Sequence, residues 1–288
     1  MSPLEAGSLN GVNHVLNVHR DKDYLADFLH RYWFAPPVAL WRSIEAKALS
    51  TLNYPAPMLD FGCGDGLYTE AIFGKQARIF GNDIAKGELP TARDSGVYTN
   101  GVQFADGHAL PYATGAFGSV YSNSVVEHIP DPHQVLPELS RVLRPGGLLI
   151  LTVPSDKFRG LLDGVTSAPN PQAAEAYATH IDTLLAHHHY HTPNEWRALY
   201  DAVGLDLIEA RYYISPETEQ KWDQMNREYG IGGRSLFNLL ASPRLRPLGY
   251  QGFMRQQVVQ QLTPKLRPFY EARVNGVGGG LLVVGKKR

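Results

Sequence analysis

The residues that most clearly suggest chemistry form a glycine cluster after a short apolar segment. Asp60, Gly62, Gly64 and Gly66 alternate with other residues in the run D-F-G-C-G-D-G. Glycine has no Cβ, so a chain that turns here from a strand into a helix lets a ligand approach the main chain closely. Free amides at the start of the helix can bind ligand oxygens. We therefore predict a ligand site at a strand–helix turn; a tight turn without a ligand is the alternative interpretation.

Two features decide what kind of ligand fits. Dinucleotide-binding enzymes carry G-x-G-x-x-G at this place, but Leu67 occupies the position of the third glycine. Asp83 ends the next apolar segment, and a carboxylate there can accept hydrogen bonds from both hydroxyls of a ribose. Nicotinamide cofactors and adenosyl donors both contain that ribose, and Asp83 could also be a helix N-cap. This residue alone therefore does not separate the alternatives.

Two further runs favour one family. Residues 104–112 read F-A-D-G-H-A-L-P-Y, and residues 117–131 read F-G-S-V-Y-S-N-S-V-V-E-H-I-P-D. With the glycine cluster and Asp83, they resemble the ordered motifs of class I S-adenosylmethionine-dependent methyltransferases, of the small-molecule, type 11-like kind. Gly118 stands where that family usually has an acid. The resemblance covers residues 58–153 and does not extend to residues 215–275.

The resemblance implies a cofactor and its binding residues. The cofactor is S-adenosyl-L-methionine, and the product formed from it is S-adenosyl-L-homocysteine. In the family, the acid after the second strand binds the ribose, the acid after the third binds adenine, and a backbone carbonyl after the fourth binds the ammonium group. Carried over position by position, the donor-binding residues are Asp60, Gly62, Cys63, Gly64, Gly66, Asp83, Ile84, Asp106, Gly107, His108 and Asn123.

Histidines are the candidate catalytic residues. Methyl transfer is an in-line displacement at an activated sulfonium, so positioning and exclusion of water do most of the work. An acceptor that carries a proton also needs a base. We predict His128, just after the fourth strand, as one candidate, and we expect His189 or His191 to line the acceptor pocket. The remaining candidate bases are His108, His187 and His188. Because consecutive histidines do not form a chelating face, no metal site is predicted.

Elements that would position these residues alternate between strand and helix. Alternation predicts an α/β fold with a parallel, doubly wound sheet. The resemblance implies a Rossmann-like sheet of seven strands, with the last strand antiparallel between the fifth and the sixth. Strands are expected at 58–61, 77–83, 102–106, 117–122, 148–153, 205–214 and 280–285, and helices at 36–48, 132–143, 171–186 and 193–203.

Four segments follow from this pattern. Residues 1–56 are expected to form a helical cap, and residues 57–214 the donor-binding core, with an insertion at 155–188. Residues 215–275 are rich in aromatic side chains, which favours a helical lid over the acceptor; a homodimer surface is the alternative. Residues 276–288 are expected to supply the last strand.

The composition of the chain limits which classes of substrate and which cellular compartment we expect. The net charge is −1, which does not favour nucleic acid as the substrate. The single cysteine and the absence of a basic, apolar leader favour the cytoplasm, and no apolar run approaches a membrane span. We therefore expect a small-molecule acceptor, methylated on O, N or C. A nicotinamide-dependent oxidoreductase and a non-catalytic donor-binding regulatory protein are the alternatives.

Overall fold

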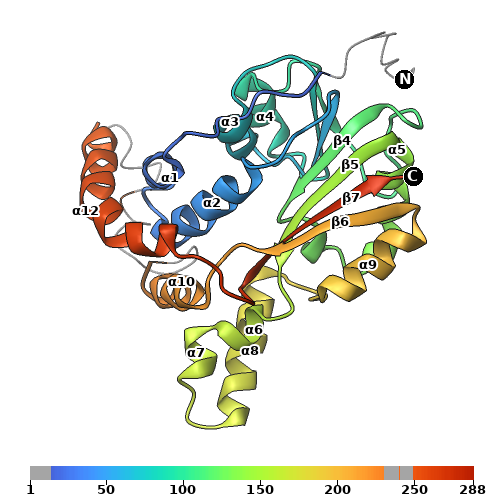
Figure 1. Cartoon of the computed structure of the whole chain (residues 1–288). Helices are drawn as coiled ribbons and strands as arrows, with labels where there is room; N and C mark the ends of the chain where they lie inside the picture. The colour runs from blue at the N-terminus through green and yellow to red at the C-terminus, as the bar shows by residue number, and fades with distance from the viewer. Residues whose placement is uncertain (1–13, 230–239, 241–248) are drawn as a thin grey trace.

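A mixed sheet of seven strands organises the chain, in the order β3-β2-β1-β4-β5-β7-β6 (Figure 1). The computed structural model describes residues 14–229, 240 and 249–288. Strands β1 to β5 are parallel, whereas β7 runs antiparallel between β5 and β6. The predicted fold class is confirmed. The strands are β1 (Met58–Phe61), β2 (Ile79–Asp83), β3 (Val102–Phe104), β4 (Phe117–Asn123), β5 (Leu143–Pro154), β6 (Leu205–Tyr212) and β7 (Gly280–Lys287).

Helices cover both faces of the sheet. Alternate residues of a strand point to opposite faces, so Ile150 of β5 packs in one apolar core and its neighbour Leu149 packs in the other. The first core contains side chains from α1, α2, α3, α4 and α12, and the second contains side chains from α5 and α9. These helices are α1 (Tyr24–Arg31), α2 (Pro36–Leu49), α3 (Leu67–Phe73), α4 (Leu89–Ser95), α5 (Leu136–Val142), α9 (Pro193–Ala202) and α12 (Gln251–Glu271).

The remaining helices lie at the carboxyl end of β5 (Figure 1). The segment between β5 and α9 folds into α6 (Phe158–Leu161), α7 (Asp163–Thr166) and α8 (Pro171–Leu185). Helix α10 (Pro216–Tyr229) follows β6 and contacts α2, α6 and α7. A small apolar core of Phe158, Leu162, Ile181 and Trp222 joins this group.

Local capping signals explain where the helices begin. Thr192 and Glu195 form the predicted capping box at the start of α9. Asp131 caps a short 3-10 turn, η2 (Pro132–Gln134), and α5 begins only at Leu136. The predicted single helix over 132–143 is therefore divided. Pro137 accounts for the break, because it has no N–H to continue an earlier helix.

The N-terminal region is helical only in part. Residues 14–22 are not helical, and Val15 forms an isolated antiparallel bridge with Pro55. Residues 1–13 of the expected cap, and residues 230–239 and 241–248 of the expected lid, lie outside the described residues. No helix in the described part of the chain is long and apolar enough to cross a membrane.

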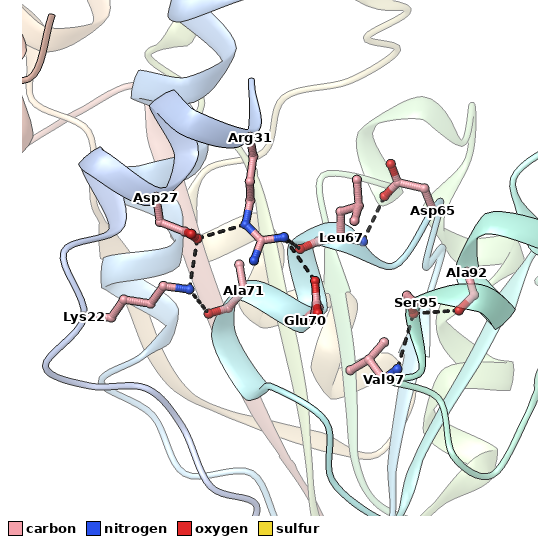
Figure 2. Close-up of polar contacts among 10 residues, drawn as sticks. All are labelled: Lys22, Asp27, Arg31, Asp65, Leu67, Glu70, Ala71, Ala92, Ser95 and Val97. Carbon is pink, nitrogen blue, oxygen red and sulfur yellow. Dashed lines mark hydrogen bonds and ion pairs between the residues drawn. The ribbon is translucent and has the colours of Figure 1, made fainter. Parts of the chain in front are cut away.

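Helix α1 is tied to α3, the helix that follows the glycine cluster (Figure 2). Arg31 on α1 donates hydrogen bonds to Glu70 Oε2 at 3.1 Å and to the carbonyl of Leu67 at 3.4 Å. Asp27, four residues earlier on α1, orients Arg31 with its Oδ2 3.0 Å from Nε. These contacts hold the N-terminal helices against the start of α3.

The contacts around Gly118 explain why this chain has glycine where the family usually has an acid. A Cβ at this position would lie 2.7 Å from the Pro55 carbonyl oxygen and 2.8 Å from that of Ala56. Any side chain would force the backbone of residues 55–56 away from β4. The acid usual in the family has no room in this chain.

We therefore predict that Gly118→Ala lowers the free energy of unfolding by roughly 1–3 kcal/mol, as overpacking typically does. Thermal melting should show a midpoint several degrees lower. Gly252→Ala is the control, because a Cβ on that residue of α12 meets no atom within 4 Å. Equal midpoints for the two variants would contradict the steric account.

Candidate functional site

The turn after β1 depends on glycine. Gly62, Gly64 and Gly66 have φ values of +75°, +51° and +78°, in the left-handed region that glycine adopts at little cost. A Cβ on Gly62 would also lie 2.4 Å from Val125 Cγ2, whereas one on Gly64 would meet nothing within 4 Å. Gly62 is thus required by packing, and the backbone at Gly64 faces open space.

Two carboxylates hold this turn in place. Asp60 is buried, and its Oδ2 accepts hydrogen bonds from Thr69 Oγ1 at 2.5 Å and from Tyr98 OH at 2.6 Å. Burial raises the pKa of Asp60 to about 6, although both hydrogen bonds act against that rise. Asp83, at the end of β2, accepts a hydrogen bond from the Gly64 amide at 2.8 Å. The ends of β1 and β2 are therefore linked through the glycine turn.

A cavity of about 490 Å³, the edge cavity, lies at the carboxyl ends of β1 to β4. Six of the predicted donor-binding residues line it, whereas Asp60, Cys63, Gly64, Gly66 and Asn123 do not. Ile84 is 64% exposed. Asp106 accepts a hydrogen bond from the His108 amide, which lowers the pKa of the Asp106 carboxyl. The lining residues are Phe61, Gly62, Asn82, Asp83, Ile84, Ala105, Asp106, Gly107, His108, Ser124, Val125, His128, Ile129, Pro130 and Val135.

A second cavity, the inner cavity, has a volume of about 220 Å³ and adjoins the first. Ser124 and His128 line both. Its other walls are mainly apolar and aromatic, and they come from α2, α6, α8 and α10 as well as from the ends of β4 and β5. The lining residues are Val38, Trp41, Arg42, Ser124, Glu127, His128, Pro154, Phe158, Leu185, His187 and Trp222.

A buried ion pair joins α2 to the end of β4 at this junction. Arg42 Nη1 donates hydrogen bonds to Glu45 Oε2 at 2.9 Å, to Asn123 Oδ1 at 2.7 Å and to Ser124 Oγ at 3.0 Å. Glu45 is fully buried, and its Oε1 accepts hydrogen bonds from Ser124 Oγ and Tyr213 OH. Burial alone would lower the pKa of Arg42, but the Glu45 carboxylate raises it instead. Both oxygens of the buried Glu45 carboxyl and Nη1 of Arg42 are therefore hydrogen-bonded.

Glu127 is a site residue that sequence reasoning missed. It lies in η1 (Val126–His128), directly after β4, and is only 2% exposed. Among the described residues, its Oε2 has no hydrogen-bond partner. Burial raises the pKa of Glu127 to about 8. The E-H pair in the sequence pointed to this place, but no local pattern shows that the glutamate is buried.

Two histidines line the inner cavity. His128 Nδ1 lies 3.0 Å from the carbonyl of Ala186, so Nδ1 carries the hydrogen. His187 Nδ1 lies 3.1 Å from Tyr190 OH, which itself donates to Asp182 Oδ1. Because that hydroxyl proton is used, His187 must donate through Nδ1, which leaves its Nε2 unprotonated. Burial lowers the pKa of His187 to about 4, so this imidazole is neutral at pH 7.

The other two predicted histidines lie elsewhere. His189 Nε2 lies 3.0 Å and 3.1 Å from the carbonyl oxygens of Val126 and Ile129. His191 packs against the rings of His189 and Trp196. Neither residue lines the two cavities, so the structure does not place them at an acceptor. In the described part of the chain, no group of histidine, cysteine or acidic side chains could hold a metal ion.

Comparison with known families agrees with this geometry. The model of the methyltransferase domain, Methyltransf_11, matches residues 59–151. These residues form a class I S-adenosylmethionine-dependent methyltransferase domain. Such domains take S-adenosylmethionine as donor, and the edge cavity fits an adenosyl donor through the acid at the end of β2, Asp83, and the close backbone approach at Gly62.

Two curated relatives extend the match beyond the domain. Methyltransferase GfsG from Streptomyces halstedii is 33% identical over 159 residues, which cover 53% of this chain and 53% of the relative. A ubiquinone biosynthesis O-methyltransferase from Dinoroseobacter shibae is 27% identical, over 66% of this chain and 78% of the relative. The chain thus spans about half the length of the first relative.

Solved structures show the same fold. A methyltransferase from Thermotoga maritima aligns with a TM-score of 0.53 and 14% identity, over 92% of this chain and all of that one. Geranyl diphosphate C-methyltransferase from Streptomyces coelicolor aligns with a TM-score of 0.52 and 14% identity, over 97% and 92% of the two chains. At 14% identity, the similarity between this chain and the two solved structures shows a shared fold and nothing more.

The buried pair leads to a stability prediction. We expect Arg42→Ala to lower the free energy of unfolding by about 3–5 kcal/mol, because it leaves the buried Glu45 carboxylate without its cation. Adding Glu45→Gln should restore part of the loss, since the uncompensated charge is removed as well. Urea unfolding of the unmodified protein and of both variants measures these changes in the free energy of unfolding. A double variant less stable than Arg42→Ala would contradict it.

Proposed function

We propose that this protein transfers the methyl group of S-adenosylmethionine to a small molecule bound in the inner cavity. One observation carries the proposal: the edge cavity and the inner cavity adjoin at Ser124 and His128. A donor in the first cavity and an acceptor in the second would meet at that junction. In-line displacement requires such an arrangement, with donor and acceptor on opposite sides of the methyl group.

On the donor side, the bound S-adenosylmethionine would supply a methyl group already activated by its sulfonium. We assign the ribose hydroxyls to Asp83 and the adenine to the Asp106–His108 turn, beside the exposed side chain of Ile84. Gly62, the one residue of the glycine turn that lines the edge cavity, would face the methionine part. Asp60 would act indirectly, through Thr69 and Tyr98, and the carbonyl of Asn123 would accept from the ammonium group.

On the acceptor side, the walls come mostly from outside residues 59–151. Helix α2 contributes Val38, Trp41 and Arg42, α6 contributes Phe158, and α10 contributes Trp222. These segments belong to the cap, insertion and lid that we propose from the sequence. Because the cavity holds about 220 Å³ and is mainly apolar, a small organic acceptor suits it better than a macromolecule.

The names of the relatives support a small-molecule acceptor. Ubiquinone biosynthesis O-methyltransferases recur among the curated relatives, and one structural relative is described as a geranyl diphosphate C-methyltransferase. We therefore keep methylation of O, N or C within the proposal at this level. The single cysteine, Cys63, is buried and unpaired, which is compatible with a reducing compartment such as the cytoplasm.

The proposed roles of the histidines change with the structure. His128, at the junction, would shield the methyl group from water. His187 takes the place we expected for His189 or His191, because it is the one of the three that lines the inner cavity. Its unprotonated Nε2 would accept a hydrogen bond from the acceptor.

Calorimetric titration tests the donor site. We expect micromolar binding of S-adenosylhomocysteine and no binding of NADH or NADPH. Asp83→Asn should weaken S-adenosylhomocysteine binding by roughly ten- to a hundredfold, because the amide loses one charge-assisted acceptor, a contribution of roughly 1.5–3 kcal/mol.

Asp65→Asn is the matched control for this titration. Asp65 lies in the same turn and accepts a hydrogen bond from the Leu67 amide, but it does not line the edge cavity. The affinity of the Asp65→Asn variant for S-adenosylhomocysteine should stay within twofold of that of the wild type. Binding of a nicotinamide instead of S-adenosylhomocysteine would refute the donor assignment.

A further inference from the structure

The buried carboxyl of Glu127 is incompletely satisfied. Its side chain lines the inner cavity, is 2% exposed, and leaves Oε2 without a hydrogen-bond partner in the described part of the chain. Buried polar groups are nearly always hydrogen-bonded, and an unpaired one costs free energy. A buried carboxyl with an unpartnered oxygen, on a residue that lines a cavity, therefore points to a ligand that brings a hydrogen-bond donor.

The charges around Glu127 favour a cationic donor. Arg42 is the nearest cation, but its guanidinium is engaged with Glu45, Asn123 and Ser124. Glu45 is a second carboxylate on the same side, and it adds to the negative potential at Glu127. The imidazole of His187 is neutral and offers no charge. The titratable groups that surround Glu127 are Arg42, Glu45, His128, His187 and Tyr213.

Aromatic rings form the facing walls of the cavity. Trp41 and Trp222 have ring centroids 5.2 Å apart at an interplanar angle of 59°, and Phe158 lies 5.8 Å from Trp41. Rings that are tilted against one another present both faces and edges to the cavity. Ring faces attract cations, and this attraction is stronger where water is excluded.

We infer that the acceptor is an amine that enters as its ammonium ion, and that Glu127 holds the ammonium group and takes its proton. This inference rests on the proposed methyl transfer and names the acceptor class and the base. Glu127 then acts as a catalytic residue, because it touches the reacting nitrogen.

The proton and electron balance of this step is complete. The Glu127 carboxylate accepts an N–H proton, and the electron pair of that N–H bond becomes the lone pair of the neutral amine. The lone pair forms the new N–CH3 bond while the C–S bond breaks, and its electrons stay on sulfur. The protonated Glu127 returns its proton to solvent when the product leaves.

The acidity of Glu127 suits this role. Its pKa of about 8 lies within about two units of that of an alkylammonium such as the lysine side chain. A base is most effective when its pKa is close to that of the group it deprotonates and to the working pH. An ordinary glutamate, near 4.3, would be a much weaker base for an ammonium.

Matched ligands test the inference without any turnover. Phenethylamine, which is an ammonium ion at pH 7, is titrated into the S-adenosylhomocysteine-bound protein beside its neutral counterpart 2-phenylethanol. We expect the amine to bind at least tenfold more tightly. In Glu127→Gln the two affinities should differ by less than threefold. Glu217→Gln, at an exposed acid on α10, should keep the full preference.

Proton release gives a second readout that needs no variant. At pH 7 Glu127 is mostly protonated, because its pKa is raised to about 8. Binding of the ammonium ion favours the carboxylate, so about 0.9 proton should leave per amine bound. Calorimetry in phosphate and in Tris, which differ in ionisation enthalpy, measures this number. The alcohol should release none.

The outcomes distinguish a failure of the amine inference from a failure of the proposed methyl transfer. If S-adenosylhomocysteine binds but the amine shows no preference over the alcohol, or no proton release, the amine inference is wrong and the proposed methyl transfer stands. If S-adenosylhomocysteine does not bind, the proposed function fails and the inference with it. Should Glu127→Gln fail to bind S-adenosylhomocysteine, Glu127→Asp replaces it: a retained preference for the amine supports the carboxylate, and equal affinities for the amine and the alcohol overturn the inference.

Discussion

The ion pair between Arg42 and Glu45 is the interaction on which the site depends. It lies at the boundary between α2 and the end of β4, and it fixes Asn123 and Ser124 through side-chain hydrogen bonds. Ser124 has a φ of +51°, an uncommon backbone conformation for a residue other than glycine. Because Ser124 borders both cavities, the pair sets how the N-terminal helices meet the donor-binding core.

Much of the fold was predictable because its signals are local. The apolar strands, the glycine turn and the capping box at Thr192 each depend on residues within a few positions of one another. The antiparallel place of β7 followed only from the family resemblance. The divided helix before β5 was missed because Pro137 was overlooked, although proline is itself a local signal.

The acceptor side was less predictable because its contacts are distant in sequence. Arg42 and Asn123 are 81 positions apart, and Glu45 and Tyr213 are 168 apart. Periodicity shows that α2 is amphipathic, but it does not show that Arg42 faces a buried carboxylate. In the same way, a run of histidines identified the region near residue 187, but only the folded chain shows that His187 is the one of them that lines the cavity.

The segment between β5 and α9 has a consequence for how this fold can diverge. Helices α6 to α8 project from the end of the sheet (Figure 1) and reach the inner cavity through Phe158, Leu185 and His187. None of these residues lines the edge cavity. Insertions, deletions or exchanges in this segment can therefore reshape the acceptor space while leaving the donor residues in place. The two cavities can therefore change largely independently, because each takes most of its lining from different segments of the chain.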